Sequence, residues 1–147
     1  MIQKTIAELF HRDLMKLKDE IKLYKQESDL WKVAPGISNS GGNLCLHLIG
    51  NLQHFIGADL GNTGFIRNRD AEFSDKDIPI SDLVNSIEKL TPEVEHIIST
   101  LSDEKFHGDF PEAKRGKVET TDHMLMHLFG HLSYHLGQIN YHRRLLS

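Results

Sequence analysis

The stretch from residue 121 to 146 most constrains the fold, because it combines an apolar helical stripe with a row of histidines. It reads TDHMLMHLFGHLSYHLGQINYHRRLL. Five apolar residues share helical spacing and define a face that packs against a core: Leu125, Leu128, Leu132, Leu136 and Ile139. His127, His131 and His135 follow one another at i, i+4 and i+8, on one neighbouring ridge. Imidazoles beside a core face predict that this helix faces the interior of a helical bundle and that its imidazoles hold a metal ion.

The helical rise limits how many of these histidines can act together. His127 and His135 are about 12 Å apart along the axis, too far to share one ion with bonds of about 2 Å. This helix must therefore supply its metal ligands as one i, i+4 pair. The pair is either His127 with His131 or His131 with His135, and the spacing leaves both open. Further ligands must come from another helix.

Three more segments show helical periodicity. They span about residues 2–28, 43–60 and 81–101. Pro92 interrupts the third without shifting its apolar stripe, which predicts one kinked helix or two short coaxial ones. Four amphipathic helices without a segment of sustained alternation predict an all-α fold, a four-helix bundle formed by one domain, residues 1–147.

Two long connections join these helices. The first, 61–79, exceeds the usual two to eight residues or so between antiparallel neighbours, and predicts a crossover that lets the second and third helices run parallel. Its charged residues are Arg67, Arg69, Asp70 and Glu72. We expect a solvated loop with local ion pairs here, the alternative being a salt-bridged wall over one end of the bundle. The second connection spans 102–120.

The second helix carries its own polar ridge beside its apolar stripe. His47, Asn51 and His54 lie at i, i+4 and i+7. Gly50 and Gly57 lie in the same helix and weaken it by up to about 1 kcal/mol each relative to Ala. Their small size predicts close packing or room for a ligand.

Composition excludes several classes of function. Lys and Arg number 17 against 21 Asp and Glu, giving a net charge of -4. No basic tract stands out, which argues against binding nucleic acid or an anionic membrane surface. Cys45 is the only cysteine, so no internal disulfide forms and a reducing compartment is favoured. We expect a buried Cys45, no membrane span, and a cytoplasmic location.

Neutral imidazole binds Zn, Ni, Cu and Fe. Two histidines on one helix and a third from across the core leave coordination positions open, as in catalytic rather than structural metal sites. The two histidine-bearing helices contain no Glu-x-x-His motif of the diiron type.

These residues carry a resemblance to a known family. The run His131-x-x-x-His135-x-Gly137-Gln138-Ile139, with His47 in an L-x-H-L setting upstream, resembles the DinB/YfiT-like metalloenzymes of the DinB superfamily. The resemblance covers nearly the whole chain. It implies an up-down-down-up four-helix bundle with a long connection between helices 2 and 3, often a homodimer. It also implies a divalent metal ion, Zn or Ni foremost and Fe or Mn as alternatives, on His47, His131 and His135.

The resemblance further implies an activity. Characterised proteins of this fold include S-transferases that use low-molecular-weight bacterial thiols and a mycothiol-dependent maleylpyruvate isomerase. We therefore expect a transferase whose metal activates a small thiol toward an electrophilic substrate. Gln138 is expected to support the metal site. This chain has Leu136 where members commonly carry Arg after the last ligand, so any anion-binding role of that Arg does not transfer.

The catalytic base is not identified by the sequence. His54 and His127 are weak candidates by helical phase, although such histidines are more often hydrogen-bonded wall residues. Two alternatives to the transferase remain: a metal-dependent hydrolase on the same site, and a non-enzymatic helical dimerisation or binding module.

Overall fold

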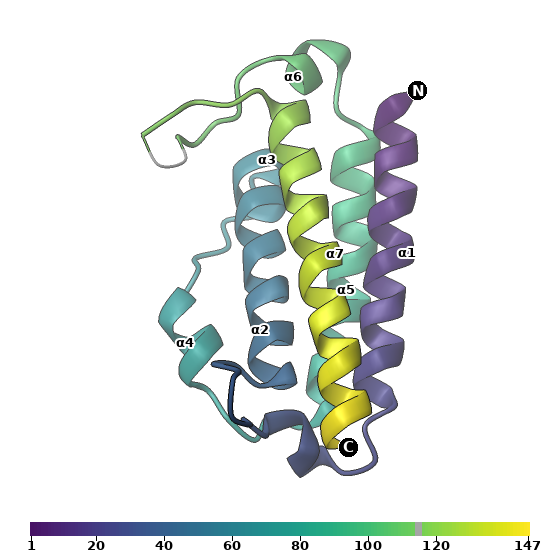
Figure 1. Ribbon diagram of the computed structural model, residues 1–147. Helices are drawn as coiled ribbons and strands as arrows, with labels where there is room; N and C mark the ends of the chain where they lie inside the picture. Colours follow the sequence, from purple (N-terminus) through teal and green to yellow (C-terminus); the bar gives the residue numbers. More distant parts are fainter. Residues whose placement is uncertain (114–115) are drawn as a thin grey trace.

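A computed structural model describes residues 1–113 and 116–147 of the chain. Its long helices are α1, Ile2–Lys22; α2, Gly41–Leu52; α5, Ile80–Ser99; and α7, Thr121–Leu146. They lie side by side along their lengths (Figure 1). The described residues contain no β-strand, only an isolated bridge between Asp109 and Thr120. The predicted all-α class is therefore confirmed.

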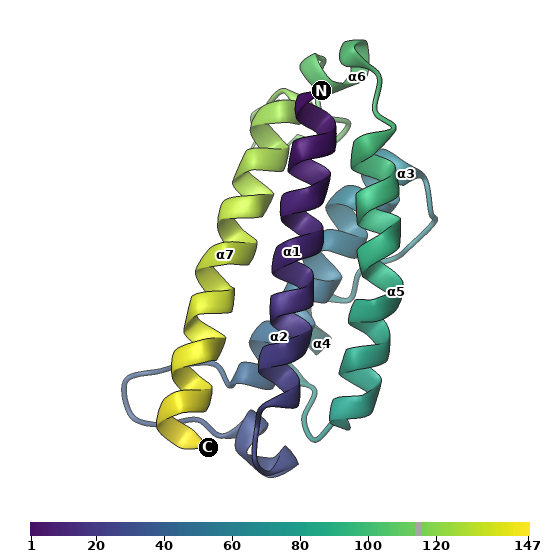
Figure 2. The ribbon, with the colours of Figure 1, turned by 90° about the vertical axis from the view of Figure 1, so that its right-hand side faces the viewer.

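The helices differ in direction. In Figures 1 and 2, α1 and α7 run downward while α2 and α5 run upward. Helix α1 packs against α5 and α7, and α2 packs against the same two helices. The connection after α2 includes a short helix, α4, Arg69–Ser74, which packs against α2. A second short helix, α6, Asp103–His107, precedes α7.

Helix boundaries differ in places from those predicted. Helix α1 ends at Lys22, and a separate 3-10 helix, Glu27–Trp31, follows it. Helix α2 begins at Gly41, after Ser40 accepts a hydrogen bond from the Asn43 amide, a side-chain cap. It continues through a π-helical turn, Gln53–Ala58, into α3, Asp59–Gly61.

Pro92 does not divide α5. The helix runs without a break from Ile80 to Ser99, so the alternative of two coaxial helices is wrong. Thr91 donates its hydroxyl to the Ile87 carbonyl at 2.7 Å, within the same helix. Because the apolar stripe keeps its phase across the proline, burial of Leu90 and Val94 holds both halves against the core.

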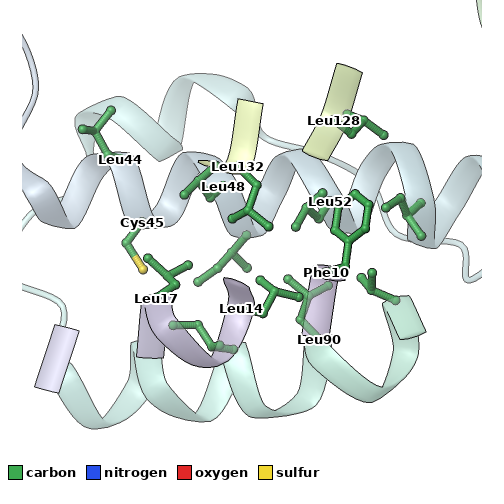
Figure 3. Packing of buried hydrophobic residues seen from close by; sticks show 14 of the residues in the cluster. Phe10, Leu14, Leu17, Leu44, Cys45, Leu48, Leu52, Leu90, Leu128 and Leu132 are labelled. Carbon is green, nitrogen blue, oxygen red and sulfur yellow. The ribbon is translucent and has the colours of Figure 1, made fainter. Parts of the chain in front are cut away.

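All four long helices contribute to one cluster of buried apolar side chains. Figure 3 shows Leu14 and Leu17 of α1 facing Leu48 of α2, with Leu132 of α7 and Leu90 of α5 nearby. Four of the five predicted core residues on α7 are fully buried: Leu125, Leu128, Leu132 and Ile139. Burial of this stripe fixes the rotation of α7, and so the direction of its histidine ridge. No described helix is both long and apolar enough to cross a membrane.

Candidate metal centre

Three histidines from two helices meet where α2 packs against α7. His47 projects from α2 and is almost fully buried, while His131 and His135, one turn apart on α7, are half-buried. Each lies on the ridge that borders its helix's apolar stripe, so burial of the two stripes turns the ridges toward each other. One nitrogen of each ring lies within 4.8 Å of the other two. This cluster, His47, His131 and His135, could hold a metal ion.

The distances suit a tetrahedral ion. Nε2 of His131 lies 3.1 Å from Nε2 of His47 and 3.1 Å from Nε2 of His135. Tetrahedral ligands with metal–nitrogen bonds of 2.0–2.1 Å are about 3.3 Å apart. Of the two pairs that the spacing left open, the structure brings His131 and His135 to His47 and leaves His127 exposed outside the cluster.

Hydrogen bonds at the outer ring nitrogens determine where the lone pairs lie. Nδ1 of His47 lies 3.0 Å from the Glu72 carboxylate, and Nδ1 of His135 lies 2.7 Å from the Gln138 carbonyl oxygen. Both partners are acceptors, so each Nδ1 carries the hydrogen and each Nε2 a lone pair. A hydrogen on His131 Nε2 could be donated to only one of these two Nε2 lone pairs. At least one of the two pairs of facing Nε2 atoms therefore repels unless a cation lies between them.

Burial also favours the neutral form of the His47 imidazole. Loss of solvent lowers the pKa of His47 from its ordinary value, although the Glu72 carboxylate acts in the opposite direction. A neutral ring retains the Nε2 lone pair near pH 7, as a metal ligand must.

Glu72 is held in turn by Arg67. The guanidinium donates from Nε to Glu72 Oε2 at 2.8 Å and from Nη2 to Oε1 at 2.9 Å. Both side chains are largely buried, at 13% and 7% exposure. This fork fixes the carboxylate and offsets its charge, so Glu72 can accept from His47 in a poorly solvated position. Phe73, which follows Glu72 in α4, covers His47, and the two ring centroids are 4.8 Å apart.

Gly50 provides the space for this contact. A Cβ at position 50 would overlap the carboxylate of Glu72. The close packing predicted for Gly50 is therefore explained by one contact. Helix α4 approaches α2 one turn from His47, and its Glu72 side chain lies against the backbone of Gly50, which has no side chain.

Sequence reasoning missed Glu72 and Arg67 as parts of the site. The sequence placed them in a solvated loop with local ion pairs, or in a wall over one end of the bundle. They form an ion pair, but a buried one beside the histidines at the side of α2. The spacing Arg67-x4-Glu72 carries no recognisable motif. The small residue Gly50, three positions after His47, was the available signal.

The two weak candidates for a catalytic base lie outside the cluster. His54 is seven residues beyond His47, about 10 Å along the helix, and pairs with Glu112 at 2.8 Å. His127 lies one turn before His131 and is exposed. Neither belongs to the group of ring nitrogens that could share the ion.

Leu136 and Cys45 lie outside the three-histidine cluster. Leu136 packs against the core and borders a groove that it shares with Lys16 and Glu20 of α1. Cys45 is fully buried as predicted, and burial raises the pKa of its thiol to about 12. Cys45 is therefore a packing residue, neither a thiolate ligand nor a nucleophile.

Comparison of the sequence with models of protein families and with curated proteins finds no match.

Proposed function

We propose that this chain is a metal-dependent enzyme of the DinB type, in which His47, His131 and His135 bind one divalent ion. The proposed architecture is the up-down-down-up four-helix bundle that the motif on α7 implies. The directions of the long helices and the crossover through α4 support it. The proposed reaction is transfer of a small thiol to an electrophilic substrate.

One observation carries the proposal: two Nε2 lone pairs converge on a third Nε2 at 3.1 Å. Glu72 and Gln138 hold the protons on the outer nitrogens, so the arrangement favours a cation at its centre. Three imidazole ligands favour Zn or Ni. Fe and Mn fit this set less well, because none of the three side chains is a carboxylate.

The site residues have distinct roles in this proposal. A bound divalent ion would supply Lewis-acid stabilisation of a thiolate. Glu72 orients His47 and Gln138 orients His135, which limits the rings to one rotation each. Arg67 holds the Glu72 carboxylate in place through two hydrogen bonds. Because His131 and His135 are only half-buried, the cluster lies close enough to the surface for a small molecule to approach from the α7 side.

The test is a thiol-conjugation assay. Metal-loaded protein is incubated with an electrophile such as a chloronitrobenzene and a panel of small thiols, and product is measured by absorbance. We expect conjugation that requires both metal and thiol and is lost in His131→Ala. His127→Ala, the exposed histidine one turn earlier, is the matched control and should remain active. Turnover of ester or amide substrates in thiol-free buffer, without conjugation, would replace the transferase by a hydrolase.

The predicted homodimer is a separate proposal. Light scattering on the purified protein tests it. A mass of 33.6 kDa, twice the 16.8 kDa of one chain, is expected.

A further inference from the structure

A second group of side chains that could hold a metal ion lies beyond the end of α2. It comprises His54 in the π-helical turn, Asp59 at the start of α3, and Glu112 in the connection between α6 and α7. Nε2 of His54 lies 2.8 Å from Glu112 Oε2 and 3.9 Å from Asp59 Oδ2. One ligand atom from each residue lies within 4.8 Å of the other two. Three separate elements thus converge on one point.

The π-helical turn is what brings His54 and Asp59 together. In an α-helix, residues five apart point about 140° away from each other. The i to i+5 bonding of a π-helix stacks residues five apart on one face. The turn spans Gln53–Ala58, so it contains His54 and ends one residue before Asp59. A single π turn is an uncommon, less stable insertion that recurs at functional sites, and here it aligns an imidazole with a carboxylate.

An unsatisfied oxygen points into this group. Asp59 Oδ2 is shielded from solvent, yet it accepts no hydrogen bond from the part of the chain that the structure describes. Leaving such an acceptor unpaired is unfavourable, and more so when it is charged. A cation between Asp59, Glu112 and His54 removes that cost.

The two carboxyl groups also oppose each other. One carboxylate oxygen of Asp59 and one of Glu112 lie within 4.8 Å of each other. Two ionised carboxylates this close repel each other. A divalent cation between them offsets that repulsion, and the nearby His54 Nε2 provides a third ligand.

We propose that His54, Asp59 and Glu112 form a second divalent-cation site, separate from the three-histidine cluster. One imidazole and two carboxylates suit a harder ion than three imidazoles do, such as Mn²⁺ or Fe²⁺, with Zn²⁺ also accommodated. His47 in α2 and His54 in the π-helical turn that follows it are about 10 Å apart along the helix axis. The two ions would thus be too far apart for the roughly 4 Å spacing of a bridged pair.

The test isolates this site by removing the first one. Metal-free His131→Ala protein is titrated with Mn²⁺, and free Mn²⁺ is counted by electron paramagnetic resonance. We expect one bound ion per chain, lost when Asp59→Asn or Glu112→Gln is added. Glu95→Gln is the matched control, because Glu95 pairs with His11 at 2.8 Å on the surface and belongs to no candidate metal group among the described residues. It should leave the bound ion in place.

Folding is checked separately, since lost binding must not reflect lost structure. Asp59→Asn and Glu112→Gln remove repulsion between the carboxyls, so both variants should keep the far-UV circular dichroism of their parent. His54→Gln provides a third variant that leaves the carboxyls intact and should weaken Mn²⁺ binding. Binding that persists unchanged in these three variants would overturn the second site, and so would no Mn²⁺ binding by folded His131→Ala protein. Neither outcome affects the proposal for the three-histidine cluster.

Discussion

Glu72 and His47 are 25 residues apart in the chain, yet the Glu72 carboxylate lies 3.0 Å from Nδ1 of His47. This contact links the connection after α2 to the histidine cluster. It sets the tautomer of His47 and directs its other nitrogen toward His131, 3.1 Å away. The segment that sequence periodicity left without structure therefore completes the site.

Replacing Glu72 by Gln should weaken metal binding. The variant removes the charge that orients His47 and leaves Arg67 without its carboxylate, and loss of such a supporting group typically costs about 10–100-fold in metal affinity. Affinity for Zn²⁺ is measured by competition with a chromophoric chelator. Asp70→Asn, an exposed change on the same short helix, should retain wild-type affinity. Equal affinity in both variants would show that Glu72 does not support the site.

Replacing Gly50 by Ala should destabilise the protein. The new methyl group overlaps the Glu72 carboxylate, and overpacking of this kind costs about 1–3 kcal/mol. Urea denaturation of the metal-free proteins measures the free energy of unfolding. Gly130→Ala on α7 is the matched control, because its Cβ would meet no atom of residues 1–113 or 116–147 within 4 Å. It should gain up to about 1 kcal/mol from helix propensity. Stabilisation of both variants to the same extent would contradict the contact.

The sequence predicted the features that depend on local periodicity. The stripe on α7 predicted the buried Leu128 and Leu132, and the adjacent ridge predicted that His131 would face another helix. Selection of His135 over His127 as its partner required the position of His47, which depends on how the helices pack. The resemblance implied the same set, His47, His131 and His135, that converges in the structure.

Other parts could not be read from the sequence, for physical reasons. The π-helical turn depends on a choice between i+4 and i+5 hydrogen bonds that no residue in Gln53–Ala58 dictates. The contact between Asp59 and Glu112 could not be predicted either, because Glu112 lies in the long connection before α7. Such connections lack the periodicity that shows which residues share a face. For the same reason the sequence predicted Arg67 and Glu72 to be charged residues of a solvated loop.

Stability of the metal-free protein should fall as pH rises toward 8. Asp59 has a folded-state pKa of about 7, above its ordinary value of 3.8, so the folded chain holds a proton that the unfolded chain has released. The stabilisation is complete below about pH 4 and is lost as pH passes through 7. Asp59→Asn should show a smaller decline between pH 5 and 8 in thermal unfolding. Parallel curves for the two proteins would contradict the raised pKa.

The most direct measurement is the metal content of the three-histidine cluster. Protein is purified without a His tag or nickel column, and bound metal is determined by elemental analysis after reconstitution with Zn²⁺ and Ni²⁺ in turn, on a background of Glu112→Gln. The account predicts one ion per chain, lost in His47→Ala, His131→Ala and His135→Ala and retained in His127→Ala. Folded protein that binds no ion, or an ion retained when His47 and His131 are replaced together, would contradict it.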